Sequence, residues 1–330
     1  MKVVLSGPVP CQGGDILRRH FGARARVLEF PHDGAPPASA DLEDAKILVS
    51  AAFDREFPPL PELRLLQVPA AGVDRIDFDA LPAGCAVCNA FEHEIGIGEY
   101  VLAAMLHWTV DLACRSARFK AGSWADSLHF SAPFRPELAG RTLGLVGYGH
   151  IGQAVARRAR GFDVRILAVT RTPRALEPAP DRLEGMDGLD DLLRASDFVV
   201  VACPLGEETR GLIGRERLAL MRPDAVLINV ARGPVVDEDA LYEALRQRRI
   251  AGAVLDVWYR YARPGAPGLR PSRHPFHELD NVVMTPHCSG WTEGLIPRRF
   301  AVVADNIERL LDGRTLRNQV WPAGPRSSER

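Results

Sequence analysis

A glycine-rich turn between an apolar strand and a helix is the feature that most constrains this fold. The apolar run 142–146 leads into Gly147-Tyr148-Gly149-His150-Ile151-Gly152, and a helical pattern follows over 151–160. The first glycine permits a tight turn, the second lets a pyrophosphate approach the backbone, and the third lets the helix pack on the strand. The helix N-terminus adds N–H donors and partial positive charge. The pattern predicts a dinucleotide site; the alternative is an ordinary tight turn.

Short β-rich runs alternate with helical patterns along the chain, as in βαβ units. In the second part, strands are expected at 142–146, 164–169, 197–202, 225–230, 252–256 and 281–285. Six parallel strands with crossover helices would make a doubly wound sheet. In the first part, strands are expected at 3–5, 27–30, 47–49, 65–68 and 86–88, with a helix at 16–21. One long helix is expected over 98–121, and another over 292–311.

The chain has 330 residues, which suggests two domains or one large one. We predict a two-lobed α/β protein in which a Rossmann-type doubly wound parallel sheet, residues 98–290, is inserted in a smaller flavodoxin-like lobe. That lobe, residues 1–97 and 291–330, would bind the substrate, and the inserted lobe would bind NAD(P). The final helix would return to the first lobe.

Charge and hydropathy exclude several classes of partner. The 41 basic and 42 acidic residues give a net charge of −1, which argues against binding nucleic acid or anionic membranes. No apolar run reaches the length of a membrane span, and the N-terminus does not resemble a signal peptide, so we expect a cytoplasmic protein. Its cysteines are then expected to be free thiols. Cys85 and Cys88 form a CxxC pair without the second pair that a zinc site needs, so we expect no metal.

The end of the strand after the glycine motif bears on the choice of cofactor. NAD enzymes usually carry Asp or Glu there to hold the ribose 2′-OH. This strand instead ends in Thr170-Arg171-Thr172-Pro173-Arg174. Thr170 can donate to a phosphate oxygen, and Arg171 and Arg174 can pair with a 2′-phosphate. The sequence therefore favours NADP (NADPH), with NAD still possible; the alternative is that both arginines are solvated loop charges.

Four further blocks follow in order at 196–213, 227–237, 255–257 and 285–290. Together with the glycine motif they resemble the D-isomer-specific 2-hydroxyacid dehydrogenase family, and in particular its glyoxylate/hydroxypyruvate reductases. The first lobe resembles that family more faintly, at 71–74 and 98–100. Glu99 matches a family position but is equally an ordinary acid in the first turn of a helix.

Reduction of a 2-keto acid needs a hydride, a proton for the developing alkoxide and a clamp on the carboxylate. Arg232, after a buried strand and before a glycine, can hold carboxylate and carbonyl oxygens together. His287, after the last strand of the sheet, has an ordinary pKa that suits proton transfer. The resemblance implies these two roles, with Asp256 binding the nicotinamide carboxamide and the backbone at 71–73 binding the substrate carboxylate.

The resemblance also implies the remaining contacts and the oligomeric state. Trp291 is expected either to line the substrate pocket or to pack between the lobes. A homodimer is the family expectation. Besides the glycine motif, Thr172 and the residues named above, the cofactor set comprises Cys203, Pro204, Leu205, Thr209, Val230, Ala231, Ser289 and Gly290; the substrate set comprises Ala71, Gly72, Val73 and Trp291.

One position departs from the family pattern. Most members place a Glu five residues after the Asp of the 255–257 block, where it bonds to the catalytic His; here that position is Tyr261. A neutral Tyr raises the pKa of a neighbouring His less than a carboxylate does, although its hydroxyl or its ring can orient the imidazole. We therefore expect a His287 pKa below that of Glu-bearing relatives. The insertion 263–274 can form a loop over the site. We expect His274 and His277 at the protein surface rather than as metal ligands.

The favoured function is reduction of a small 2-keto acid, such as glyoxylate or hydroxypyruvate, to the D-2-hydroxy acid. One alternative is a dinucleotide-sensing binding protein without turnover, as in corepressor relatives. Another is a formate-dehydrogenase-like hydride transferase, because those relatives also lack the Glu. The presence of Arg232 and His287 favours the reductase.

Overall fold

The chain folds into two compact units. The computed structural model describes residues 1–31, 42–130, 132–262 and 268–322. Unit 1 is built from both ends of the chain, up to Glu92 and again from Thr292. Unit 2 is the continuous segment His93–Trp291. The divisions therefore fall at 92/93 and 291/292, where the sequence suggested 97/98 and 290/291; the assignment of substrate to one unit and cofactor to the other stays a prediction.

Unit 1 contains a sheet whose described strands are ordered β13-β5-β4-β3-β1-β2. Neighbouring strands are parallel, except that β13 runs antiparallel to β5. Their bounds are β1 Lys2–Ser6, β2 Arg26–Phe30, β3 Ile47–Ser50, β4 Leu65–Gln67, β5 Ala86–Cys88 and β13 Gln319–Trp321. The helices are α1 Pro8–Cys11, α2 Gly14–Phe21 and α10 Leu295–Leu311, with 3-10 turns Gly22–Arg24 and Phe78–Ala80.

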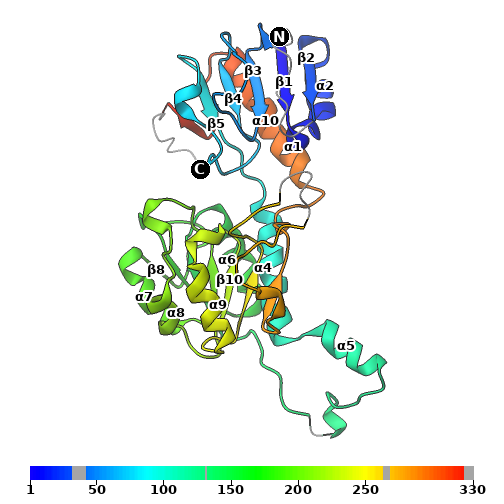
Figure 1. The fold of residues 1–330 in the computed structure, drawn as a ribbon, viewed down its shortest axis with the longest axis vertical. Helices are drawn as coiled ribbons and strands as arrows, with labels where there is room; N and C mark the ends of the chain where they lie inside the picture. The colour runs from blue at the N-terminus through cyan, green and yellow to red at the C-terminus, as the bar shows by residue number, and fades with distance from the viewer. Residues whose placement is uncertain (32–41, 131, 263–267, 323–330) are drawn as a thin grey trace. The chain divides into compact units, whose positions relative to one another are not determined.

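One face of the unit 1 sheet packs against α2 and α10 (Figure 1). Leu17 and Phe21 of α2 join Phe300 and Val303 of α10 in a cluster with side chains of β1 and β3. The last helix of the chain thus completes the core that the first strand begins. Burial of such side chains stabilises the fold by roughly 1.5–3 kcal/mol each.

Unit 2 contains a wholly parallel sheet whose described strands are ordered β12-β11-β10-β9-β6-β7-β8. Their bounds are β6 Thr142–Val146, β7 Arg165–Val169, β8 Arg182–Glu184, β9 Phe198–Val201, β10 Val226–Asn229, β11 Gly252–Leu255 and β12 Val282–Met284. The helices are α4 Glu94–Thr109, α5 Leu112–Lys120, α6 His150–Ala159, α7 Leu189–Ala195, α8 Arg215–Leu220 and α9 Glu238–Arg246. The 3-10 turns are Leu128–Phe130, Arg160–Phe162, Met186–Gly188, Glu207–Thr209, Gly233–Val235 and Phe276–Glu278.

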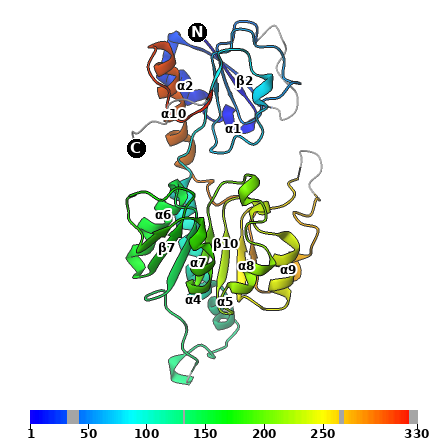
Figure 2. The ribbon, with the colours of Figure 1, turned by 90° about the vertical axis from the view of Figure 1, so that its left-hand side faces the viewer.

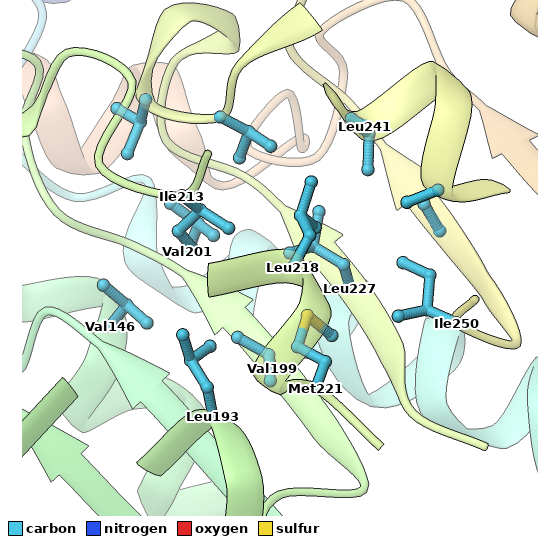
Figure 3. Packing of buried hydrophobic residues seen from close by; sticks show 14 of the residues in the cluster. Val146, Leu193, Val199, Val201, Ile213, Leu218, Met221, Leu227, Leu241 and Ile250 are labelled. Atoms are coloured by element: carbon cyan, nitrogen blue, oxygen red, sulfur yellow. The ribbon is translucent and has the colours of Figure 1, made fainter. Parts of the chain in front are cut away.

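Helices cover both faces of this sheet (Figure 2). Val199 and Val201 of β9 point into a cluster with α7, α8 and α9, of which Figure 3 shows the packing. Phe198 and Val200 point the other way, into a cluster with α4 and α6. Burial on both faces explains why these strands are continuous apolar runs. The strand order reverses beside β6, and ligands of such sheets bind at the carboxyl ends of the strands near this reversal.

The predicted α/β fold is confirmed, and each predicted strand lies within one residue of its expected bounds. Two strands were missed. Arg182–Glu184 (β8) extends the described part of the unit 2 sheet from six strands to seven, and Gln319–Trp321 (β13) joins the unit 1 sheet. Both are three residues long, and neither is an apolar run, so they carry little periodic signal.

The prediction of one long helix over 98–121 was wrong, because α4 ends at Thr109 and α5 begins at Leu112. Asp111 adopts the left-handed conformation, with φ of 49°. The Val110 N–H donates to the Leu106 carbonyl, and the Asp111 N–H to the same oxygen, at 2.7 and 3.4 Å. A left-handed residue of this kind closes a helix, and Asp tolerates that conformation better than most residues.

The segment that follows the break, residues 112–130 and 132–134, is here called the arm. None of the α5 residues, all of which the structure describes, is buried. In both ribbon views α5 and the chain after it extend away from the sheet of unit 2 (Figures 1 and 2). The arm exposes large apolar side chains: Leu112, Phe119, Trp124, Leu128, Phe130 and Phe134. Phe119 and Phe130 pack against Trp124, and Arg115 and Arg118 pair with Asp126.

Among the described residues, no helix is both long enough and apolar enough to span a membrane.

Candidate active site

The glycine turn after β6 has a separate steric reason at each glycine. Gly147 has φ of 105°, and a Cβ there would lie 2.7 Å from the Cys203 backbone nitrogen. A Cβ on Gly152 would lie 2.4 Å from the Gly147 carbonyl oxygen. A Cβ on Gly149, by contrast, would meet no heavy atom within 4 Å. The turn is therefore tight at its ends and open in the middle, at the N-terminus of α6, which suits the approach of a dinucleotide pyrophosphate.

Tyr148 was predicted to contact the cofactor, but its side chain turns inward and is only 1% exposed. Its hydroxyl donates a hydrogen bond to the Pro178 carbonyl. The Arg160 guanidinium, just beyond α6, donates to the neighbouring Ala179 carbonyl. The glycine turn and the end of α6 thus hold the loop that follows β7.

That loop carries the candidate 2′-phosphate ligands. Thr170 continues β7, and its N–H donates to the Glu184 carbonyl at 3.0 Å. Arg171, Thr172 and Arg174 follow, all exposed to solvent. Two cationic side chains therefore lie just after the carboxyl end of β7. Hydrogen bonds from Thr170 to β8 and from Tyr148 to Pro178 hold the backbone of their loop.

After β9 the chain forms a short closed loop at the same edge of the sheet. The Thr209 hydroxyl donates to the Pro204 carbonyl at 2.7 Å and accepts from the Gly206 N–H at 2.8 Å. Burial raises the pKa of the Cys203 thiol to about 11, so this cysteine stays protonated. Leu205 packs partly buried against the core of the sheet. The predicted cofactor residues of this block therefore share one rigid loop.

Arg232 follows β10 in a turn that the buried Asn229 fixes from both sides. The Asn229 side chain accepts from the Ala231 N–H at 3.1 Å and donates to the Arg232 carbonyl at 3.2 Å. A Cβ on Gly233 would lie 2.4 Å from the Trp258 carbonyl oxygen, so glycine is required after the arginine. Val230 and Ala231 are buried in the strand end. The guanidinium also donates to the Ala231 carbonyl at 2.8 Å.

His287 lies in a loop that the carboxylate of Asp256 organises. Asp256 directly follows β11 and is 0% exposed. Its Oδ1 accepts from the Thr285 hydroxyl at 2.6 Å and from the Cys288 N–H at 2.8 Å, and its Oδ2 accepts from the Ser289 N–H at 2.9 Å. His287 itself has φ of 59°, a left-handed conformation that is uncommon outside glycine and recurs at functional sites.

These bonds occupy acceptor positions that the predicted contact of Asp256 with the nicotinamide carboxamide would need. A carboxylate oxygen has two lone pairs, so Oδ2 retains one acceptor position after bonding Ser289. The contact stays a prediction. What the structure adds is that Asp256 already holds the loop of His287 by its backbone.

Tyr261 lies against His287, with ring centroids 5.6 Å apart and planes inclined by 51°. Its hydroxyl accepts from the Trp258 N–H at 3.2 Å. Residues 263–267, part of the insertion suggested to cover the site, lie outside the described residues. Among the described residues that follow, His274 stacks on Tyr242 and contacts Asp239. The His277 side chain is partly exposed.

The electrostatic surroundings of His287 lower its pKa below the ordinary value. Partial loss of solvent around the imidazole contributes most, although His287 as a whole residue is exposed. The positive charge of Arg232 lowers the pKa further, and the negative charge of Asp256 acts in the opposite direction. Arg232 follows β10 and His287 follows β12, and these two strands flank β11 in the sheet of unit 2.

The remaining predicted residues are divided between the units. Ala71, Gly72 and Val73 follow β4 in unit 1, where the Asn89 side chain donates to the Ala71 carbonyl at 2.8 Å. In unit 2, Gly290 packs near His93. The side chain of Trp291 is half-exposed, and its backbone N–H donates to the Cys288 carbonyl at 2.9 Å. Glu99 is mostly exposed and faces Arg158 of α6 at 3.9 Å, which suits an ordinary helix acid.

In the part of the chain that the structure describes, no three His, Cys, Asp or Glu side chains are grouped so that they could hold a metal ion. Burial raises the thiol pKa of Cys85 to about 11 and that of Cys88 to about 12.

Three residues that shape the site were not singled out from the sequence: Asn229, Trp258 and Thr285. The indole N–H of Trp258 donates to the Thr285 carbonyl at 2.8 Å. All three stand inside or beside the blocks that carry the family resemblance, which is the signal that could have found them. Their roles depend on backbone partners that a residue pattern does not reveal.

Comparison with known proteins agrees with this arrangement. Residues 102–289 match the family model described as D-isomer specific 2-hydroxyacid dehydrogenase, NAD binding domain. The chain is 34% identical to the glyoxylate reductase of Thermococcus onnurineus (strain NA1) over 325 residues, covering 94% of this chain and 93% of that protein. It is 33% identical to glyoxylate/hydroxypyruvate reductase B of Yersinia pestis (strain Pestoides F) over 327 residues, covering 97% of each.

A solved structure shares the whole fold. It is a D-isomer specific 2-hydroxyacid dehydrogenase from Xanthobacter autotrophicus Py2, crystallised with NADPH and MES, and it superimposes with a TM-score of 0.78 at 30% identity. The similarity covers 97% of both chains.

The contrast between Gly149 and Gly152 gives a testable prediction. We expect Gly149→Ala to keep the melting temperature of the wild type but to weaken dinucleotide binding at least about tenfold, because the new methyl occupies only the space for the pyrophosphate. We expect Gly152→Ala to lower the melting temperature by several degrees, because its methyl collides with the Gly147 carbonyl. Calorimetry and fluorescence titration with NADPH and NADH measure both. Unweakened binding by Gly149→Ala would contradict the assignment of this turn.

Proposed function

This chain belongs to the D-isomer-specific 2-hydroxyacid dehydrogenase family, and from that premise we propose that it reduces a small 2-keto acid of the glyoxylate or hydroxypyruvate type to the D-2-hydroxy acid. The observation that carries the proposal is the presence of Arg232 and His287 in loops at one edge of the unit 2 sheet, after the two strands that flank β11. A nicotinamide dinucleotide supplies the hydride when it is bound.

Arg232 is proposed to bind and orient the substrate. A guanidinium can donate to a carboxylate oxygen and to the adjacent keto oxygen together, which fixes the carbonyl and stabilises the charge that develops on its oxygen. Asn229 and Gly233 fix the backbone on either side of Arg232, so the side chain starts from a defined position. The predicted substrate contacts of Ala71, Gly72 and Val73 stay predictions of the resemblance.

His287 is proposed to give its proton to the alkoxide during reduction and to take it back during oxidation. The Tyr261 ring restricts the imidazole from one side, and Asp256 fixes the loop through backbone amides. Proton donation requires the imidazolium form, which Arg232 and burial disfavour. Reduction should therefore depend steeply on pH near neutrality.

We further propose a preference for NADPH over NADH. The exposed Arg171 and Arg174 support it, since either can pair with a 2′-phosphate. Of the relatives compared above, the Xanthobacter enzyme was crystallised with NADPH. We also expect the enzyme to need no metal, since the arginine and the histidine together supply the clamp and the proton.

The first test measures turnover at 340 nm with glyoxylate and hydroxypyruvate, using NADPH and NADH in parallel. We expect NADPH-preferring turnover by the wild type. Arg171→Ala and Arg174→Ala should each raise the KM for NADPH about tenfold and leave the KM for NADH unchanged. Arg165→Ala is the matched control, because Arg165 is also exposed but begins β7 at the opposite end of the strand.

Equal losses with both cofactors would contradict the 2′-phosphate role of the arginines. Tight cofactor binding without turnover of any keto acid would instead favour a dinucleotide sensor. Turnover with formate alone would favour a formate-dehydrogenase-like hydride transferase.

The lowered pKa of His287 predicts the pH dependence of the reaction. The rate of reduction should fall as pH rises through an apparent pKa below about 6.5, and the rate of oxidation should rise over the same range. Tyr261→Glu should move both profiles up by about one pH unit, because a carboxylate beside the imidazole favours its charged form. Tyr261→Gln is the uncharged control and should leave them in place. If the pH profiles of Tyr261→Glu and Tyr261→Gln coincide, His287 is not the group whose titration controls the rate.

We propose finally that the enzyme is a homodimer whose arm covers a second copy of the chain. Large apolar side chains exposed together on one segment are typical of protein–protein contacts. Leu128 is 83% exposed and Phe134 is fully exposed. Arg115 and Arg118 both form ion pairs with Asp126, which hold the arm in a defined shape. A folded segment without its own core needs a partner to bury these side chains.

Light scattering tests the dimer. The wild type should have twice the chain mass of 36.2 kDa. Replacing both Leu128 and Phe134 by Asp should shift the mass toward that of one chain, because two charges would have to be buried in the contact. Leu269→Asp is the control, since Leu269 is a half-exposed apolar residue outside the arm. A wild type at the mass of one chain would rule the proposal out.

A further inference from the structure

Tyr100, in the middle of α4, contacts the loop that carries His287. Its hydroxyl lies 2.7 Å from the Thr285 hydroxyl. Thr285 in turn lies 2.6 Å from the Asp256 carboxylate. None of the roles assigned above uses this tyrosine.

The directions of these two hydrogen bonds can be deduced. The carboxylate oxygens of Asp256 accept from Cys288 and Ser289, and Oδ1 also accepts from the Thr285 hydroxyl. A threonine hydroxyl has one proton, so it can only accept from Tyr100. The chain of donation therefore runs from Tyr100 through Thr285 to Asp256. Burial raises the pKa of Tyr100 to about 12, so the phenol keeps its proton across the working pH range.

Asp256 connects the Thr285 hydroxyl to the loop that carries His287. Its two oxygens accept the N–H groups of Cys288 and Ser289, the residues that directly follow the histidine. Hydrogen bonds in series polarise one another, so a donor at the far end strengthens those that follow. The Tyr100 hydroxyl therefore fixes the rotamer of Thr285 and, through it, the orientation of the carboxylate.

The same helix also supports the other end of the loop. A Cβ on Gly290 would lie 3.1 Å from Cβ of His93 and 3.4 Å from Ile97 of α4. The helix thus touches the loop at Thr285, before the histidine, and at Gly290, after it. His287 lies between these two points, in a left-handed conformation that its surroundings must hold.

We propose that Tyr100 is a positioning residue for His287, acting through Thr285 and Asp256. The proposal rests on the proposed role of His287 in proton transfer. Without the phenol hydroxyl, the Thr285 hydroxyl loses the donor that fixes it, and the loop samples positions in which the imidazole is misplaced for proton transfer. Small displacements of this kind are costly for catalysis because the reacting atoms must be held closely.

Tyr100→Phe, Thr285→Val and the double variant test this by turnover. We expect Tyr100→Phe to lower kcat about tenfold and to leave the KM for NADPH within about twofold. Thr285→Val should lower kcat at least as much. The double variant should be no worse than Thr285→Val, because Tyr100 acts only through that hydroxyl. Tyr242→Phe, which removes a hydroxyl outside this chain of bonds, is the matched control and should keep wild-type kcat.

Hydrogen exchange of the Cys288 and Ser289 amides provides a readout that needs no turnover. We expect Tyr100→Phe to speed their exchange at least about threefold while amides of β9 keep their protection. If the wild type turns over no substrate, the proposed function fails, and this exchange still decides whether Tyr100 holds the loop.

Three results would overturn the proposal. One is wild-type kcat in Tyr100→Phe. Another is loss in the double variant equal to the product of the single losses, which would show that Tyr100 acts independently of Thr285. The third is unchanged exchange at Cys288 and Ser289.

Discussion

The buried carboxylate of Asp256 is the interaction on which the site depends. A charge without solvent contact is stable only if donors surround it, and here the donors are the Thr285 hydroxyl and two backbone amides of the next loop. The requirement acts in both directions. The loop satisfies the charge, and the charge selects one conformation of the loop, including the left-handed backbone of His287. An apolar side chain at this position would place no such demand.

The parallel sheet of unit 2 explains how residues so far apart in sequence meet. Gly147, Thr170, Cys203, Arg232 and Asp256 each follow a different strand, and every one of those strands runs in the same direction. Their carboxyl ends therefore form one edge, and the residues just past them become neighbours. Tight backbone packing then limits side chains at that edge, as at Gly147 against Cys203 and Gly233 against Trp258.

Most of this architecture could be predicted from the sequence, because buried parallel strands are unbroken apolar runs. β8 could not, since Arg182-Leu183-Glu184 owes its place to pairing with β7 rather than to its own hydrophobicity. The break before α5 depends on one backbone conformation at Asp111. In the site, residue types indicated Arg232, His287 and Tyr261. The inward orientation of the Tyr148 side chain and the hydrogen bonds from Thr285 through Asp256 depend on backbone carbonyl and amide partners. Residue types alone do not predict such partners.

The discontinuous construction of unit 1 has a consequence for how the protein is made. Unit 2 is one continuous stretch, whereas β1 to β5 must wait for α10, whose Phe300 and Val303 complete their core, and for β13, which pairs with β5. On the ribosome the first 92 residues emerge well before those partners exist. Unit 2 can fold as it emerges, while the N-terminal strands keep apolar surface uncovered until the last part of the chain is synthesised. Folding of the N-terminal strands therefore depends on synthesis of the segment that carries α10 and β13.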